Sequence, residues 1–242
     1  MSRQMLSQIL NSRGIAIYLI TYLLLLVTAP GKASVIEIMG GFSPIGSTGL
    51  KVISIMRWNL CVMPPVIVSI LFMSLELGKL SCYTVIRTKS ISHWFVMRYI
   101  CVVLSGIVYL LCFMLVTTAL GYNVGCGIES VCVFMLVFSV HITLVSTISV
   151  TLLITSRSHR VALLSFFAID GGMVVVGSMF PSASKYILPF WGMANNEGFL
   201  FLNNYLYLLT TVGISILLLA LFAVAALKWL RANNPAANPQ NI

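Results

Sequence analysis

The chain has 242 residues, of which 60% are apolar and only 8% are charged, whereas an average soluble domain carries about 25% charged residues. This composition excludes a water-soluble globule, an intrinsically disordered chain and a disulfide-rich secreted scaffold. We interpret the net charge of +9 as a topology signal first and not as a nucleic-acid footprint, because cytoplasmic loops of membrane proteins collect Lys and Arg.

The apolar runs predict an all-α integral membrane protein with one membrane domain covering residues 1–242. A helix needs about 20 mostly apolar residues to cross a bilayer, and six runs of roughly that kind lie between charged or turn residues. The expected spans cover about 14–30, 58–77, 99–120, 131–155, 161–180 and 205–227.

The N-terminal segment before the first span is expected to form a short interfacial helix. Residues Met5, Leu6, Ile9 and Leu10 fall on one helical face, and polar residues occupy the rest of the segment 1–13. A helix with this pattern lies on a membrane surface.

The second span contains Pro64 and Pro65, which remove two backbone donors and are expected to bend the helix. Its flanking charges, Arg57 and Glu76, are 19 residues apart, or about 28 Å along a helix. They are therefore predicted to lie at opposite membrane boundaries. The prolines form either a bent gate on a translocation path or a static kink packed by neighbouring helices.

The segment between the second and third spans, residues 76–98, is the most distinctive part of the chain. It combines four basic residues and one acidic residue with apolar residues at helical spacing. A plain basic loop explains the charges but not the apolar spacing. We therefore expect a helix on the cytoplasmic surface, followed by a Ser turn into the third span.

The fifth span carries Asp170, which is ten residues from Arg160 and so about 15 Å into the membrane. A carboxylate at that depth costs at least about 2.5 kcal/mol on insertion scales. Asp170 is therefore predicted to form a structural hydrogen bond to the fourth span, with a cargo or proton-relay role as the alternative. The adjacent Gly171 and Gly172 are expected to let the fourth and fifth spans approach closely.

The partner expected for Asp170 is Thr147, which lies ten residues from Arg157 and hence at the same depth. His141 is 16 residues from Arg157, about 24 Å from the inner surface. It is therefore expected to sit at another depth than Asp170.

Between the fifth and sixth spans, residues 181–204 contain an apolar stretch that is broken by Pro189. This stretch is expected to form either an external hairpin that re-enters the membrane or an aromatic belt at the interface.

The distribution of charge predicts the orientation. An even number of spans places both termini on one side, which then carries ten of the 14 basic residues. Both termini are therefore expected in the cytoplasm. The ten residues are Arg3, Arg13, Lys79, Arg87, Lys89, Arg98, Arg157, Arg160, Lys228 and Arg231, and the other four are Lys32, Lys51, Arg57 and Lys185.

Motifs for chemistry on this chain itself are missing. Neither Gly-Lys pair belongs to a phosphate-binding loop, and the sequence has no H-E-x-x-H or C-x-x-C motif. We therefore expect no metal, no cofactor and no enzymatic activity of its own.

These features resemble the transmembrane subunits of ABC-2 type transporters. That family has an acidic residue closing the second span, a glycine soon after it, a short coupling helix and then a basic-Ser element. Here Glu76, Gly78, residues 86–90 and Arg98 fill the pattern, although the usual glycine–threonine pair is missing. The segment 1–13 is similar to the family's N-terminal elbow, and residues 181–204 are similar to its external hairpin.

The resemblance implies a permease in a bacterial cytoplasmic membrane that exports an amphipathic or hydrophobic substrate, such as a peptide antibiotic, a drug or a lipid. Antimicrobial-peptide export or immunity is the implied type. Two copies of an ATPase subunit, which hold ATP and Mg²⁺, and a second permease, the same or paralogous, complete such a transporter. The residues implied to couple to the ATPase are Glu76, Gly78, Tyr83, Arg87, Lys89, Ser90 and Trp94. The residues expected on the path or as intramembrane polar groups are Pro64, Pro65, Asp170, His141 and Thr147.

Two other classes remain as alternatives. The first is the six-span substrate-binding subunit of a vitamin importer, which needs a concave polar site near the outer surface and a small-residue docking face on the first span. Residues 18–27 show no such small-residue spacing. The second is a membrane-embedded enzyme, for which the catalytic motifs are missing.

Overall fold

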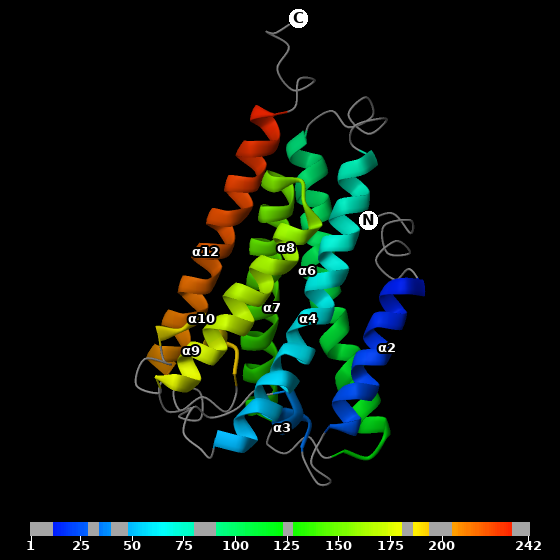
Figure 1. Cartoon of the computed structure of the whole chain (residues 1–242), viewed down its shortest axis with the longest axis vertical. Helices are drawn as coiled ribbons and strands as arrows, with labels where there is room; N and C mark the ends of the chain where they lie inside the picture. The colour runs from blue at the N-terminus through cyan, green and yellow to red at the C-terminus, as the bar shows by residue number, and fades with distance from the viewer. Residues whose placement is uncertain are drawn as a thin grey trace, which may run out of the picture.

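The computed structural model describes residues 12–28, 34–39, 48–79, 91–122, 128–180, 186–193 and 205–233. Regular structure within these ranges is entirely helical, as the composition predicts, and the long helices form one bundle (Figure 1). The elements are α2 (Ser12–Val27), α3 (Val35–Met39), α4 (Thr48–Lys79), α6 (Ile91–Ala119), α7 (Ile128–Ser156), α8 (His159–Phe166), the π-helical segment η2 (Phe167–Gly172), α9 (Met173–Met179), α10 (Leu188–Trp191) and α12 (Tyr205–Ala232).

Five of the described helical stretches are long and apolar enough to cross a membrane, and they define a multi-pass membrane protein. They are Val52–Gly78, Ile91–Ala119, Val131–Ser156, His159–Met179 and Leu208–Ala232. The span expected at 14–30 corresponds to α2, whose apolar part, Gly14–Val27, has only 14 residues. That is about 21 Å of helix against about 30 Å of hydrocarbon, so the first of the six expected spans stays a prediction.

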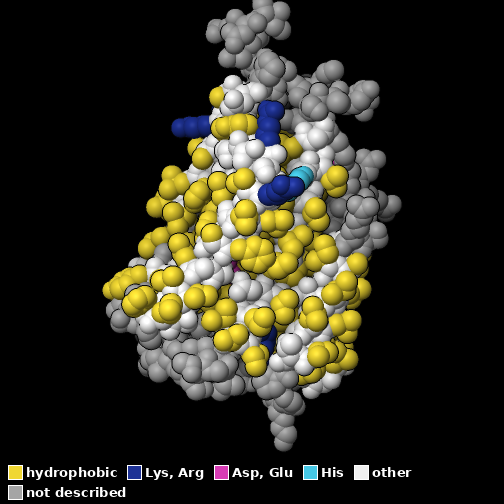
Figure 2. Space-filling model, viewed as in Figure 1, with side chains coloured by type: hydrophobic (Ala, Val, Ile, Leu, Met, Phe, Trp, Pro, Cys, Tyr) yellow, Lys and Arg dark blue, Asp and Glu magenta, His cyan; other side chains and the backbone are white. Residues whose placement is uncertain are grey.

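Helix α7 is the centre of the bundle, packed against α12, α4, α8 and α6. Every residue from 141 to 150 is buried, as expected of a helix covered on all sides. Its hydroxyls bond largely to its own backbone: Thr147 donates to the carbonyl of Thr143 at 2.6 Å, and Thr151 to that of Thr147 at 2.8 Å. The large apolar side chains at the surface instead form the broad hydrophobic face in Figure 2.

Helix α4 continues through Pro64 and Pro65, both of which are buried. The carbonyls four residues earlier, at Leu60 and Cys61, have no proline N–H to accept from. Ser69 donates its hydroxyl to the carbonyl of Pro65 at 2.7 Å. Figure 1 shows α4 changing direction near its middle, which agrees with the bend expected from the proline pair.

Polar contacts bind the helix ends together where α4 and α7 finish and α6 and α8 begin, which we call the basic end. Arg98 of α6 donates to Glu76 of α4 at 2.8 Å, and Glu76 is only 2% exposed. Ser74 of α4 bonds to His159 of α8 at 3.1 Å. The described Lys and Arg side chains lie here except for Arg57, and Figure 2 shows most of the dark blue cations at this end.

A turn of two residues joins α7 to α8 at the basic end. Arg157 has a φ of 53°, which is uncommon for a residue other than glycine, and its guanidinium lies 5.7 Å from the centre of the Trp229 ring on α12. Ser158 then caps α8 by accepting from the backbone N–H of Val161. Helix α7 therefore ends, and helix α8 begins, at the same level of the bundle.

Helix α6 begins at Ile91, eight residues earlier than the expected start of the third span. The segment expected to lie on the surface up to Arg98 is therefore part of this long helix from Ile91 onward. The reason is burial: Trp94 is 1% and Phe95 3% exposed, so they pack into the bundle. Tyr83, Arg87, Lys89 and Ser90 lie outside the described residues, as do the expected interfacial helix at residues 1–11 and most of the segment 181–204.

A hydrogen bond between α2 and α6 gives a direct test of this packing. The hydroxyl of Tyr22 donates to the carbonyl of Tyr109 at 2.6 Å, whereas the hydroxyl of Tyr109 has no partner in the described part of the chain. We expect Tyr22→Phe to lower the free energy of unfolding by about 0.6–1.7 kcal/mol, the range for such bonds in membrane proteins. Tyr109→Phe is the matched control and should be neutral. Unfolding by denaturant in detergent micelles measures both, and equal losses would contradict the assigned bond.

Candidate functional site

A buried carboxylate joins three helices in the middle of the bundle. Asp170 of η2 is 0% exposed. Its Oδ2 accepts from the indole Nε1 of Trp58 on α4 at 3.1 Å, and its Oδ1 is 3.0 Å from Nε2 of His141 on α7. When this carboxyl group is ionised it only accepts hydrogen bonds, and Nε2 of His141 then carries the donated proton.

Aromatic rings pack around the cluster of Asp170, Trp58 and His141. The Trp58 ring centre lies 5.4 Å from that of His141 and 5.3 Å from that of Phe138. His141 itself is 3% exposed. A buried acid is tolerated only when its oxygens are hydrogen-bonded, and Trp58 and His141 supply a partner for each oxygen from two different helices.

The expected depth of His141 is therefore wrong, and so is Thr147 as the partner of Asp170. Thr147 instead lies 2.6 Å from the hydroxyl of Tyr99 on α6. The depth of His141 was measured from Arg157 and that of Asp170 from Arg160, but the two helices meet at the same turn, residues 157–158. Counted from that turn, the offset is about four residues or 6 Å, which the side chains and the oblique crossing of α8 and α7 in Figure 1 can span.

Asp170 sits in the π-helical segment η2, which the sequence did not predict. A π-turn holds one more residue than an α-turn and is frequent at functional sites. Gly171 faces α4, not α7 as expected: a Cβ there would lie 3.2 Å from Oδ1 of Asn59. Gly192, after α10, does approach α7, because a Cβ there would meet Cγ of His141 at 2.6 Å, and Gly106 of α6 approaches it too, since a Cβ there would lie 3.1 Å from Cγ2 of Ile142.

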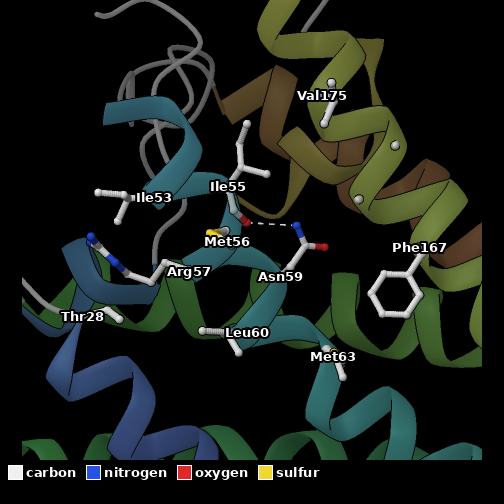
Figure 3. Close-up of a pocket in the computed structure, with 12 residues that line it drawn as sticks. Thr28, Ile53, Ile55, Met56, Arg57, Asn59, Leu60, Met63, Phe167 and Val175 are labelled. Carbon is white, nitrogen blue, oxygen red and sulfur yellow. Dashed lines mark hydrogen bonds between the residues drawn. The ribbon is translucent and has the colours of Figure 1, made fainter. Parts of the chain in front are cut away.

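A cavity of about 890 Å³ lies beside this cluster. Figure 3 shows α4 running along it, with Thr28 of α2 on one side and Phe167 of η2 and Val175 of α9 on the other. Most of its side chains are apolar. The lining residues are Thr28, Ile53, Ile55, Met56, Arg57, Asn59, Leu60, Met63, Phe167, Gly171, Gly172 and Val175.

Two polar side chains of the cavity lack partners in the described part of the chain. Asn59 donates from Nδ2 to the carbonyl of Ile55 at 2.9 Å (Figure 3), but its buried Oδ1 accepts nothing. The buried Nε of Arg57 donates to nothing, and no described acidic side chain forms an ion pair with this guanidinium. An unpaired buried polar atom costs about 1–3 kcal/mol, so these two side chains are polar features of a mostly apolar cavity wall.

The other expected site residues are spread along the bundle. Pro64 follows directly on the cavity residue Met63, while Glu76 and Gly78 lie at the basic end of α4. Trp94 lies buried on α6, with Arg98 5.7 Å from its ring centre. Among the described residues, no three or more His, Cys, Asp or Glu side chains are placed to hold a metal ion.

Comparison of the chain with protein-family models, with curated proteins and with solved structures finds no match. Fold and site geometry therefore carry the functional argument.

Substitutions of Asp170 separate its shape from its charge. Asp170→Leu leaves the N–H groups of Trp58 and His141 without an acceptor, and we expect it to cost about 2–6 kcal/mol of unfolding free energy at 1–3 kcal/mol each. Asp170→Asn should cost much less, because its oxygen still accepts from Trp58 while neutral His141 can switch tautomer and accept from its amide. Denaturant unfolding in micelles measures both, and equal losses would contradict this network.

Gly192 is predicted to matter through its contact with His141. Gly192→Ala places a methyl group 2.6 Å from Cγ of His141, and such overpacking typically costs about 1–3 kcal/mol. The matched control is Gly213→Ala on α12, where a Cβ has nothing within 4 Å and alanine favours the helix. The thermal midpoint in detergent should fall for the first variant and hold or rise for the second. An unchanged midpoint for Gly192→Ala would show that α10 does not pack on His141 in this way.

Proposed function

We propose that this chain is the membrane-spanning permease subunit of an ATP-driven exporter of the ABC-2 type, in a bacterial cytoplasmic membrane. It provides a path for an amphipathic or hydrophobic substrate, and a separate ATPase subunit supplies the energy. ATP and Mg²⁺ belong to that ATPase in this proposal. Two ATPase copies and a second permease, the same or paralogous, complete the transporter.

The observation that carries the proposal is that α4 extends from the basic end of the bundle to the cavity. One end holds Glu76, bonded to Arg98 of α6, and the other end lines the cavity from Ile53 to Met63. From Glu76 to Arg57 is about 28 Å of helix. A single helix therefore connects the basic end, where an ATPase would dock, with the cavity where a substrate would bind.

This arrangement suggests how movement would pass through the bundle. The Glu76–Arg98 pair holds together the two helix ends that flank the basic segment 80–90. A push on that segment by an ATPase would reach α4 and α6 together. The proline pair then gives α4 a place to bend, so that the cavity end can change its position relative to α2 and α9.

The chemistry of the cavity favours this reading over the substrate-binding subunit of a vitamin importer. Such a subunit needs a concave polar site for a polar ligand. Here seven apolar side chains line the cavity, and the polar ones are Thr28, Arg57 and Asn59. Apolar walls with few polar groups suit an amphipathic molecule.

Coupling to the ATPase can be tested by charge reversal at the basic end. We expect Arg87→Glu with Lys89→Glu to weaken assembly with the ATPase and to lower ATP hydrolysis that copurifies with the full chain. Glu76→Lys should also lower it, because Arg98 then faces a like charge. Combining Glu76→Lys with Arg98→Glu should restore part of the activity, since the pair is remade.

The matched control is Lys228→Glu, an exposed cation at the same end of the bundle. Its hydrolysis should stay near the wild-type rate. Wild-type assembly and hydrolysis in the Arg87 and Lys89 double variant would refute the coupling assignment. If no hydrolysis of ATP copurifies with the wild-type chain, the proposed transporter itself fails.

A further inference from the structure

The cavity contains a cation in an otherwise apolar setting. Arg57 is partly covered by the protein, its Nε has no acceptor, and none of the described acidic side chains pairs with its guanidinium. Figure 3 shows Arg57 on the side of α4 that faces Thr28, with Asn59 on the opposite side toward Val175. A ligand with a negative charge would form an ion pair with the Arg57 guanidinium, and a cationic ligand would be repelled by it.

The order of polarity along the cavity fits one kind of molecule. Arg57 lies about 28 Å along α4 from Glu76, near the boundary of a bilayer about 30 Å thick. Ile53, Ile55 and Met56 line the cavity on the outer side of Arg57, and from Arg57 the cavity continues past Leu60 to Met63 and Phe167, about 9 Å deeper along the helix. A charged group at the boundary with an apolar chain extending inward is the layout of an anionic lipid.

Volume and chemistry narrow the ligand further. A cavity of about 890 Å³ is in the range of small-molecule sites, about 300–1,000 Å³, so it holds one hydrocarbon chain more readily than two. A planar guanidinium matches a phosphate group, to which it can donate two parallel hydrogen bonds.

We propose that the cavity between α2, α4 and η2–α9 binds an anionic phospholipid. The phosphate pairs with Arg57, and one acyl chain lies along Leu60, Met63 and Phe167. As an assignment of cargo this rests on the proposed function, but as a binding site it is a property of this chain alone. It can therefore be measured without any ATPase.

The test is native mass spectrometry of the purified full chain in detergent. The probes are dioleoyl phosphatidylglycerol, phosphatidylcholine with the same chains, and inorganic phosphate. We expect the wild-type chain to retain phosphatidylglycerol about tenfold better than phosphatidylcholine, and Arg57→Gln to lose that preference. Arg160→Gln is the matched control at the basic end and should keep it. Val175→Trp should weaken retention of both lipids, because it fills the cavity from a side chain that is already 45% exposed.

Four other outcomes would overturn the assignment. Equal retention of the two lipids would show that Arg57 does not select a charge. Equal loss in Arg57→Gln and Arg160→Gln, with thermal midpoints unchanged, would show diffuse surface binding. Retention of inorganic phosphate by itself would indicate a site for a free anion. If ATP hydrolysis copurifies with the chain but phosphatidylglycerol is not retained, this inference fails while the transporter stands. If phosphatidylglycerol is retained but no ATP hydrolysis copurifies with the chain, the lipid site stands while the proposed transporter fails.

Discussion

A carboxylate in an apolar bundle has to find its hydrogen-bond partners inside the protein, and Asp170 finds them on two other helices. In a bilayer there is no water to replace a missing partner. The indole of Trp58 and the imidazole of His141 must therefore stay within about 3 Å of the carboxyl oxygens. This requirement fixes the positions of α4, α7 and η2 relative to one another. The π-turn at Asp170 and the close approaches at Gly171 and Gly192 follow from it.

Small residues and an irregular turn make this meeting of helices possible. The π-turn of η2 presents Asp170 toward the bundle centre, and Gly171 brings α4 close on the adjacent face. Gly192 brings the segment after α10 against the His141 ring, where a methyl group would not fit. The segment that follows α10, the central helix α7 and the buried acid are thus packed as one unit.

The sequence was sufficient for the broad fold and insufficient for the site. Long apolar runs predict membrane-crossing helices because length and composition alone decide them, and five are found. Asp170 stood out because it is an acid in an apolar run, but its partner His141 was missed, since depth counted from flanking arginines ignores the shared turn and the crossing angle. Gly192 gave no signal at all: its role depends on a contact with a residue 51 positions away. Trp94 was misplaced because its burial, not its local pattern, decides that α6 starts early.

Helix α4 ties the buried acid to the cavity through three consecutive residues. Successive side chains on an α-helix are about 100° apart, so Arg57, Trp58 and Asn59 cannot share one environment. Trp58 points inward to Asp170, which leaves Arg57 and Asn59 on the two sides of the cavity. On the opposing segment the same division occurs, because Asp170 faces the centre while Gly171 lines the cavity. Any rotation of α4 that widened or narrowed the cavity would therefore strain the Trp58–Asp170 hydrogen bond. A ligand that changed the width of the cavity by rotating α4 would for that reason also act on the buried pair.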